Sequence, residues 1–222
     1  MPIKAVRPES SVFLKTVDRQ PHGIVHLLGT GKQFKTGTYA QLFEVCSHLR
    51  TRPKAFVGVP DVSFLPEELN ARVCDTIYDV LPGEIAVIDD VARMHPSRGA
   101  SDPMLTRYLG TISHKDILVI LTGQCSLNYD IAFHRDQSVV FLHKYMDYHG
   151  IRAERPHVAL HCLMGDKEIT RWASTLDVWR GFFTYIPDFQ EVLYMPDPAP
   201  WYDERLSHSL RDVTVQPKGG KV

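Results

Sequence analysis

The sequence predicts an α/β fold with a mostly parallel central sheet and helices on both of its faces, a three-layer sandwich. Five short β-rich segments alternate with helical stretches in the first two thirds of the chain. Four of the five segments are almost continuously apolar, as strands buried on both faces are, whereas half-exposed antiparallel strands alternate apolar and polar residues. Strands that alternate with helices are typical of a doubly wound sheet.

The first strands and the helix between them have the clearest pattern. A crossover helix is expected over residues 38–50, where Leu42, Val45, Cys46 and Leu49 recur at helical spacing. In chain order, the expected strands are residues 23–30, 54–59, 84–90, 116–123 and 137–144.

A second helix is expected over residues 66–81. Pro66 suits the first turn of a helix, and Pro82 with Gly83 ends the pattern. Periodicity is weaker beyond residue 151, and residues 196–210 indicate a turn followed by a helix. The aromatic tract 179–189 is expected in the core or at a subunit interface.

Composition is that of an ordinary globular protein: 222 residues, 44% hydrophobic, with a formal net charge of −1. We expect one domain over residues 1–222, with a core at about 20–145, a C-terminal extension at about 151–215 and a disordered tail at 216–222. No apolar run has the ~20 residues that a membrane-spanning helix needs, and four widely spaced cysteines indicate reduced thiols. The near-neutral charge excludes a monomer coated in positive charge, so nucleic acid would have to be contacted by local loops or by an assembled ring.

A phosphate-binding loop is predicted at residues 29–36, GTGKQFKT, between the first strand and the crossover helix. This segment fits the Walker A spacing G-x-x-x-x-G-K-[ST], except that Phe34 holds a position where Gly adopts the required backbone shape freely. Lys35 would reach the β and γ phosphates, and Thr36 would bind Mg²⁺. A shifted register with Lys32 as the phosphate lysine is the alternative. The residues expected to surround the nucleotide are Gly29, Thr30, Gly31, Lys32, Gln33, Phe34, Lys35, Thr36 and Gly37.

Polar residues end two further strands. Asp89 and Asp90 follow the apolar segment EIAVI, as in a Walker B strand, and Gln124 follows the strand DILVILTG. Because parallel strands end at the same edge of a sheet, these side chains should face the phosphate loop. Asp89 would hold Mg²⁺, Asp90 would orient or deprotonate the attacking water, and Gln124 would bind the γ-phosphate or that water.

Two arginines are candidates for a finger that stabilises charge on the transferred phosphate. Arg98 lies in the loop after the acidic pair, and Arg135 follows the Gln124 strand; Arg98 is preferred, because a protruding loop can reach a neighbouring subunit. Two basic clusters, Arg50-Arg52-Lys54 and Arg152-Arg155, are expected on solvated faces, with contact to DNA phosphates as the alternative.

This order of parts resembles the FtsK/HerA superfamily of P-loop motor ATPases (RecA/ASCE-like P-loop NTPases), over about residues 20–145. Within that superfamily the chain is most similar to the genome-packaging ATPases of membrane-containing icosahedral viruses, and residues 200–210 resemble the zonula-occludens-toxin-like branch. The resemblance implies hydrolysis of ATP with Mg²⁺, coupled to the translocation of double-stranded DNA by a homo-oligomeric ring of five or six subunits. It also implies partners at the capsid vertex or in the viral membrane, and a location in host cytoplasm and virion.

The same resemblance assigns roles by position. Lys35 and Thr36 match the phosphate loop, Asp89 the metal-binding acid, Asp90 the catalytic acid and Gln124 the sensor. Asp90 is shorter than the Glu usual in the family, which implies a slow ATPase or one that is active only in the ring. Two alternatives stay open: a P-loop nucleotide-binding assembly protein with little or no hydrolysis, and a small P-loop phosphotransferase.

Overall fold

The computed structural model describes residues 3–97, 101–135 and 138–208. Strands in these ranges form one sheet in the order β1-β9-β8-β7-β2-β6-β5-β3-β4. Their bounds are β1 Lys4–Val6, β2 Gly23–Leu28, β3 Lys54–Val57, β4 Ala71–Cys74, β5 Ile85–Ile88, β6 Leu118–Gly123, β7 Val139–His143, β8 Phe183–Ile186 and β9 Glu191–Tyr194. Only the β7–β8 and β8–β9 pairs are antiparallel within this sheet. The predicted, mostly parallel α/β sheet is therefore confirmed.

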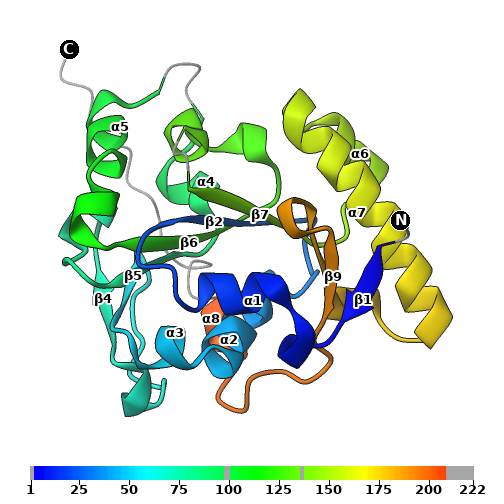
Figure 1. Cartoon of the computed structure of the whole chain (residues 1–222). Helices are drawn as coiled ribbons and strands as arrows, with labels where there is room; N and C mark the ends of the chain where they lie inside the picture. Colours follow the sequence, from blue (N-terminus) through cyan, green and yellow to red (C-terminus); the bar gives the residue numbers. More distant parts are fainter. Residues whose placement is uncertain (1–2, 98–100, 136–137, 209–222) are drawn as a thin grey trace.

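Helices cover both faces of the sheet, which gives the predicted three layers (Figure 1). On one face lie α1 (Val12–Val17), α2 (Lys35–Val45), α3 (Ser47–Thr51) and α8 (Glu204–His208). On the other lie α4 (Val91–Met94), α5 (Pro103–Leu109), α6 (Tyr148–Arg152) and α7 (Pro156–Leu176). The position of α8 agrees with the helix expected near residue 204.

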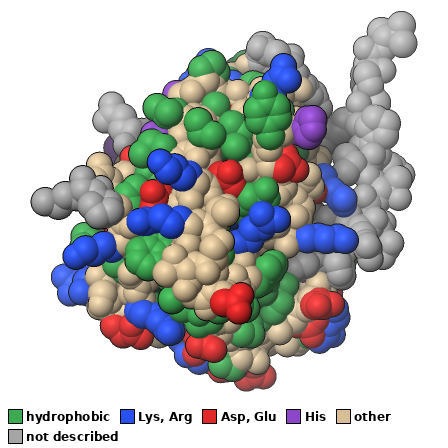
Figure 2. Space-filling view, turned by 90° about the vertical axis from the view of Figure 1, so that its right-hand side faces the viewer, with side chains coloured by type: hydrophobic (Ala, Val, Ile, Leu, Met, Phe, Trp, Pro, Cys, Tyr) green, Lys and Arg blue, Asp and Glu red, His purple; other side chains and the backbone are tan. Residues whose placement is uncertain are grey.

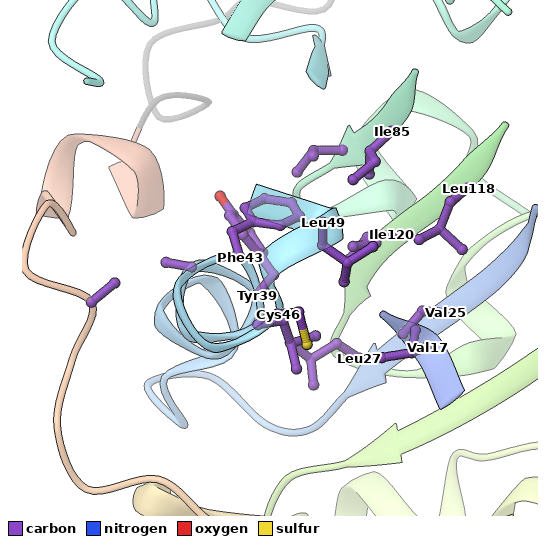
Figure 3. Packing of buried hydrophobic residues seen from close by; sticks show 14 of the residues in the cluster. Val17, Val25, Leu27, Tyr39, Phe43, Cys46, Leu49, Ile85, Leu118 and Ile120 are labelled. Atoms are coloured by element: carbon purple, nitrogen blue, oxygen red, sulfur yellow. The ribbon is translucent and has the colours of Figure 1, made fainter. Parts of the chain in front are cut away.

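Packing against the central strands fixes α2 in place. Tyr39 and Phe43 of α2 are fully buried over Val25 and Leu27 of β2 and Ile120 of β6 (Figure 3). Each large apolar side chain buried in this way contributes about 1.5–3 kcal/mol. The core therefore holds the beginning of α2, and with it the segment between β2 and α2, at the middle of the sheet.

The expected crossover helix is interrupted. Cys46 has an extended backbone (φ −104°, ψ 106°) between α2 and α3. A helix can restart there because the Asp18 carboxylate accepts hydrogen bonds from the backbone N–H groups of His48 (2.9 Å) and Leu49 (3.2 Å), which no residue of α3 could satisfy.

The prediction of a helix over residues 66–81 is wrong. The segment forms strand β4 between two short 3-10 helices, Glu67–Leu69 and Ile77–Asp79. Asn70 adopts the left-handed conformation (φ 47°), which ends the first turn, and its carbonyl accepts the N–H of Lys54 as β4 begins to pair with β3. A short apolar run fits strand or helix equally well, and here the open edge of β3 selects the strand.

The basic cluster Arg50-Arg52-Lys54 makes mostly intramolecular hydrogen bonds. Lys54 is fully buried, and its Nζ donates to the carbonyls of Arg50, Arg52 and Leu69 at 2.7–3.1 Å. Burial lowers the pKa of Lys54 to about 8. Arg52 donates to four backbone carbonyls, among them Gly83 at 2.7 Å. These side chains hold the end of α3 against the sheet, so the expectation of a solvated basic face fails for Arg52 and Lys54.

Helix α7, which the sequence pattern does not single out, lies at the side of the molecule that Figure 2 faces. Its inner face buries Val158, Cys162 and Ile169. Its outer face exposes Leu160, Leu163 and Met164, and hydrophobic side chains are visible between basic ones on this side (Figure 2). Among the described helices, none is both long and apolar enough to cross a membrane.

Several histidines are buried between the sheet and the helices of this face. His26 of β2 bonds the Tyr129 hydroxyl (2.7 Å) and the Phe133 carbonyl (2.9 Å), and its ring lies 4.8 Å from that of His134. His143 of β7 contacts the Cys162 thiol at 3.3 Å. Burial lowers the pKa of His134 to about 4 and that of His143 to about 3, so both imidazoles are neutral near pH 7.

Candidate functional site

The segment between β2 and α2 lies at the carboxyl edge of the sheet, where β2 is flanked by β6 and β7. Gly29 N–H donates to the Gly123 carbonyl and Thr30 N–H to the Tyr145 carbonyl, both at 3.3 Å. A Cβ on Gly29 would lie 2.6 Å from Cβ of Lys144, so only glycine allows this close approach to the chain after β7. Both neighbouring strands therefore hold the base of the loop.

Two residues of the loop just before helix α2 have a left-handed backbone conformation. Gly31 and Lys32 at its tip are exposed, whereas Gln33 and Phe34 are half-buried. Lys32 has φ 60° and Phe34 has φ 58°, which confirms that the sixth position of the motif needs a conformation that glycine adopts freely. The Phe34 ring covers Gly37, where a Cβ would come within 2.1 Å of the ring.

Lys35 folds back over the loop. Its Nζ donates to the carbonyl oxygens of Gly29 and Thr30, each at 2.9 Å. Burial lowers the pKa of Lys35, and the negative charges of Asp89 and Asp90 oppose that shift. The ammonium group is thus held above the loop, at the end of α2 where free N–H groups and the helix dipole favour an anion.

Thr36 and Asp89 meet, although 53 residues separate them in the chain. The Thr36 hydroxyl donates to one carboxylate oxygen of Asp89 at 3.0 Å, and the Thr122 hydroxyl of β6 donates to the other. Asp89 is buried, which raises its pKa, while the two hydroxyl donors oppose that shift. The backbone N–H of Asp90 completes the network by donating to Thr122 at 2.9 Å.

Asp90 has a partner that the sequence analysis missed. Its carboxylate forms an ion pair with Nε of Arg93 at 2.8 Å, one turn along α4. Asp90 itself is left-handed, with φ 50°, and about a third of its side chain is exposed. The spacing of three residues between an acid and a basic residue was the available signal.

Gln124 and Arg135 lie in different places. Gln124 is exposed and directly follows Gly123, which pairs with Leu28 at the phosphate-loop edge. Arg135 is exposed and follows the 3-10 helix Ile131–His134, in which the ring of His134 lies 4.8 Å from that of His26, in the middle of β2. The structure therefore brings Gln124 to the edge of this chain's own loop, whereas Arg135 follows a residue that packs against the middle of β2. Arg98 lies outside the described residues.

Lys144, directly after β7, is a second buried lysine at the same edge. Its Nζ donates to the Gly181 carbonyl (2.6 Å) and the Thr184 hydroxyl (3.1 Å), which are uncharged oxygens. Burial, with a smaller contribution from the charge of Lys35, lowers the pKa of Lys144 to about 7. The sequence analysis does not single out this residue, because its burial depends on β8, which comes from a distant part of the chain.

The central strand order β7-β2-β6-β5-β3, with the loop after β2 and the acids after β5, can be compared with known proteins. No family model matches the chain, and no curated protein sequence matches it. Solved structures do. The genome packaging NTPase B204 from Sulfolobus turreted icosahedral virus 2, in complex with ATP-γ-S, has a TM-score of 0.51 at 13% identity, over 78% of this chain and 95% of that chain.

The DNA-packaging ATPase B204 from Sulfolobus turreted icosahedral virus has a TM-score of 0.50 at 12% identity, over 78% of this chain and 96% of that chain. The chain has the fold of a P-loop NTPase. The predicted resemblance to viral genome-packaging ATPases is thus confirmed at the level of the fold.

The N-terminal domain of zonular occludens toxin from Neisseria meningitidis is less similar, with a TM-score of 0.42 at 18% identity, over 55% of this chain and 76% of that chain. The predicted likeness of residues 200–210 to that branch stays a prediction.

Proposed function

We propose that this protein hydrolyses ATP with Mg²⁺ and uses the energy to move double-stranded DNA into a viral capsid. The convergence of Lys35, Thr36 and Asp89 at the carboxyl edge of the sheet carries the proposal. Residues from two distant parts of the sequence form there the lysine, hydroxyl and carboxylate that a metal-bound triphosphate requires. The fold shared with B204, a protein described as a genome packaging NTPase and solved with ATP-γ-S, supports the same reading.

The donor set fits Mg²⁺. The Thr36 hydroxyl and the Asp89 carboxylate are in contact at 3.0 Å, and both are the hard oxygen ligands that Mg²⁺ prefers. Bound there, Mg²⁺ would neutralise charge on the phosphate oxygens. Thr122 acts on Asp89 by holding its second oxygen, which fixes the direction of the first.

The other residues bind the triphosphate and orient water. Main-chain N–H groups of the loop and of the first turn of α2 bind phosphate oxygens, and Lys35 exchanges its two carbonyl acceptors for them. Asp90 accepts a proton from the attacking water, for which its carboxylate must leave Arg93, and Gln124 orients that water. Arg98 or Arg135 acts as the finger on a neighbouring subunit's nucleotide.

A ring of five or six copies would carry out translocation, in host cytoplasm and at the packaging vertex of the virion, with capsid or viral membrane proteins as partners. The exposed Leu160, Leu163 and Met164 of α7 supply apolar surface for a contact with one of these proteins.

Phosphate release from Mg-ATP, measured with and without double-stranded DNA, tests the proposal. Release should be stimulated by DNA and lost in Lys35→Ala and Asp89→Ala. Lys32→Ala is the matched control, because Lys32 is an exposed lysine of the same loop. Loss of activity in Lys32→Ala but not in Lys35→Ala would instead establish the shifted register. Release that is unchanged in both the Lys35 and Asp89 variants would refute the proposal.

A nucleotide-binding assembly protein with little hydrolysis is the second candidate. The ion pair between Asp90 and Arg93 favours it, because it occupies the carboxylate that would accept the water's proton. ATP binding without phosphate release, including with DNA and with the Arg93→Ala variant that frees Asp90, would support this candidate over the motor.

A further inference from the structure

Three aromatic side chains from distant parts of the sequence meet beside the phosphate loop. The Phe34 ring centroid lies 5.3 Å from that of Tyr202 and 6.1 Å from that of Trp179, in edge-to-face geometry. Phe34 ends the phosphate loop, Trp179 follows α7, and Tyr202 follows β9. We call Phe34, Trp179 and Tyr202 the aromatic cluster.

Three sets of contacts surround the phosphate loop, and the aromatic cluster is one of them. Behind the loop, Gly29 contacts Lys144 and Thr30 bonds the Tyr145 carbonyl, so that side is closed. On the Asp89 side, the Thr36 hydroxyl and the carboxylate form the proposed metal site. The Phe34 side remains, where the Phe34 ring packs over Gly37 in the same first turn of α2 that carries Lys35.

Trp179 presents a fixed aromatic surface. One side of its indole packs over Gly181, where a Cβ would come within 2.3 Å of the ring, and it lies edge-to-face on Phe182 at 5.3 Å. Even so, 44% of Trp179 is exposed. A large ring that is held on one side and open on the other is suited to stacking on a flat ligand.

Phe34 adds a second, independent observation. Its left-handed backbone, φ 58°, is one that glycine adopts without strain and phenylalanine does not. Strained residues of this kind persist mainly at ligand and catalytic sites, where the side chain does something that a smaller one cannot. Here the side chain contributes a ring in contact with both Trp179 and Tyr202.

We propose that the aromatic cluster is the base-binding surface of the nucleotide site, and that it selects purine over pyrimidine nucleoside triphosphates. The base stacks on the open side of Trp179, whose ring Phe34 contacts directly, and Tyr202 packs against Phe34. Stacking depends on ring size more than on edge groups, so the larger purine is favoured while adenine and guanine are distinguished little. This inference rests on the proposed function, because it takes the triphosphate to bind at Lys35.

Calorimetric titration of the full chain with ATP, CTP and inorganic triphosphate tests it. Trp179→Ala should weaken ATP binding about tenfold and leave triphosphate binding unchanged, while Trp179→Phe should retain most of the affinity. Tyr148→Ala is the control, since Tyr148 is an aromatic residue of α6 that is 67% exposed. Equal loss of ATP and triphosphate binding in Trp179→Ala, or ATP binding as in the wild type, would overturn the proposal.

Fluorescence gives a second readout. Of the three tryptophans in the chain, Trp172 and Trp201 can be changed to Phe, which leaves Trp179 to report. ATP should then quench the emission and triphosphate should not; quenching by neither, while ATP binds, contradicts the stacking. If Lys35→Ala abolishes triphosphate binding but Trp179→Ala changes neither ATP nor triphosphate binding, the proposed base-binding surface is wrong and the proposed function is unaffected. Absence of both ATP and triphosphate binding in the wild type overturns the proposed function with it.

Discussion

Replacing Phe34 by glycine should leave a more stable protein than replacing it by alanine. Both changes delete the same ring and therefore the same contacts with Trp179 and Tyr202. They differ only in the backbone at a residue whose φ is 58° and ψ is 35°. The comparison of the two variants thus isolates the strain at this position.

The magnitude follows from two opposing costs. Alanine in the left-handed region costs about 1–2 kcal/mol, while the greater freedom of glycine in the unfolded chain costs about 0.5–1 kcal/mol. We expect Phe34→Gly to exceed Phe34→Ala in unfolding free energy by about 0.5–1 kcal/mol. Both should be less stable than the wild type, because each lost aromatic pair is worth about 0.5–1.5 kcal/mol.

Urea unfolding followed by circular dichroism measures this difference. The same Ala and Gly pair at Leu160, an exposed residue within α7, is the control. In an ordinary helical position glycine is about 1 kcal/mol less favourable than alanine, so the order of the two variants should reverse. If Phe34→Ala proves at least as stable as Phe34→Gly, the backbone at this position is not strained and the reasoning fails.

Three further predictions concern buried polar groups. His134 and His143 have folded pKa values of about 4 and about 3, below the usual 6.5, so stability should fall as the pH drops from 7 to 5, by about 2 kcal/mol per histidine; a urea midpoint that stays constant over this range contradicts their burial as neutral rings. Lys144 has a folded pKa of about 7 against the usual 10.5, so stability should rise as the pH increases from 7 to 8, by at most about 1.4 kcal/mol per pH unit. Lys144→Met should remove that slope in the same assay, whereas above pH 8 the buried Lys54, with a folded pKa of about 8, adds a slope of its own. Thr122→Val should lower the unfolding free energy by about 2–3 kcal/mol, because Asp89 and the Asp90 N–H both lose a hydrogen bond. A loss below about 0.5 kcal/mol, which is the contribution of a single weak surface contact, would show that the network contributes little.

The parts of the fold that the sequence predicts correctly are those with local causes. Continuous apolar runs mark β2, β5 and β6, and the polar residues after them must share an edge once the strands are parallel. The contact between Thr36 and Asp89 follows from that topology alone, which is why it could be foreseen across 53 residues.

The features that the sequence does not predict depend on distant segments of the chain that pack against the residues in question. Residues 71–74 form a strand because β3 offers a free edge there, and nothing in their own pattern says so. Lys144 is buried where β8 packs beside it, and no local pattern around residue 144 indicates that burial. Trp179 and Tyr202 reach Phe34 from the far end of the chain, so no local motif connects the three.

The arrangement of the sheet also sets the order in which the molecule can be completed during synthesis. β2 and the phosphate loop are made early, but β7, which flanks β2, ends at His143, and β8 and β9 follow α7. Near the N-terminus, β1 cannot pair until β9, its partner in the sheet, has been made, with Lys4 opposite Glu191. Pairings this distant in sequence slow folding, because the loop between them must close before they form. A ribosome-bound chain that ends before Trp179 therefore contains the phosphate-loop sequence but lacks two rings of the aromatic cluster, which is complete only after Tyr202, beyond β9, has been made.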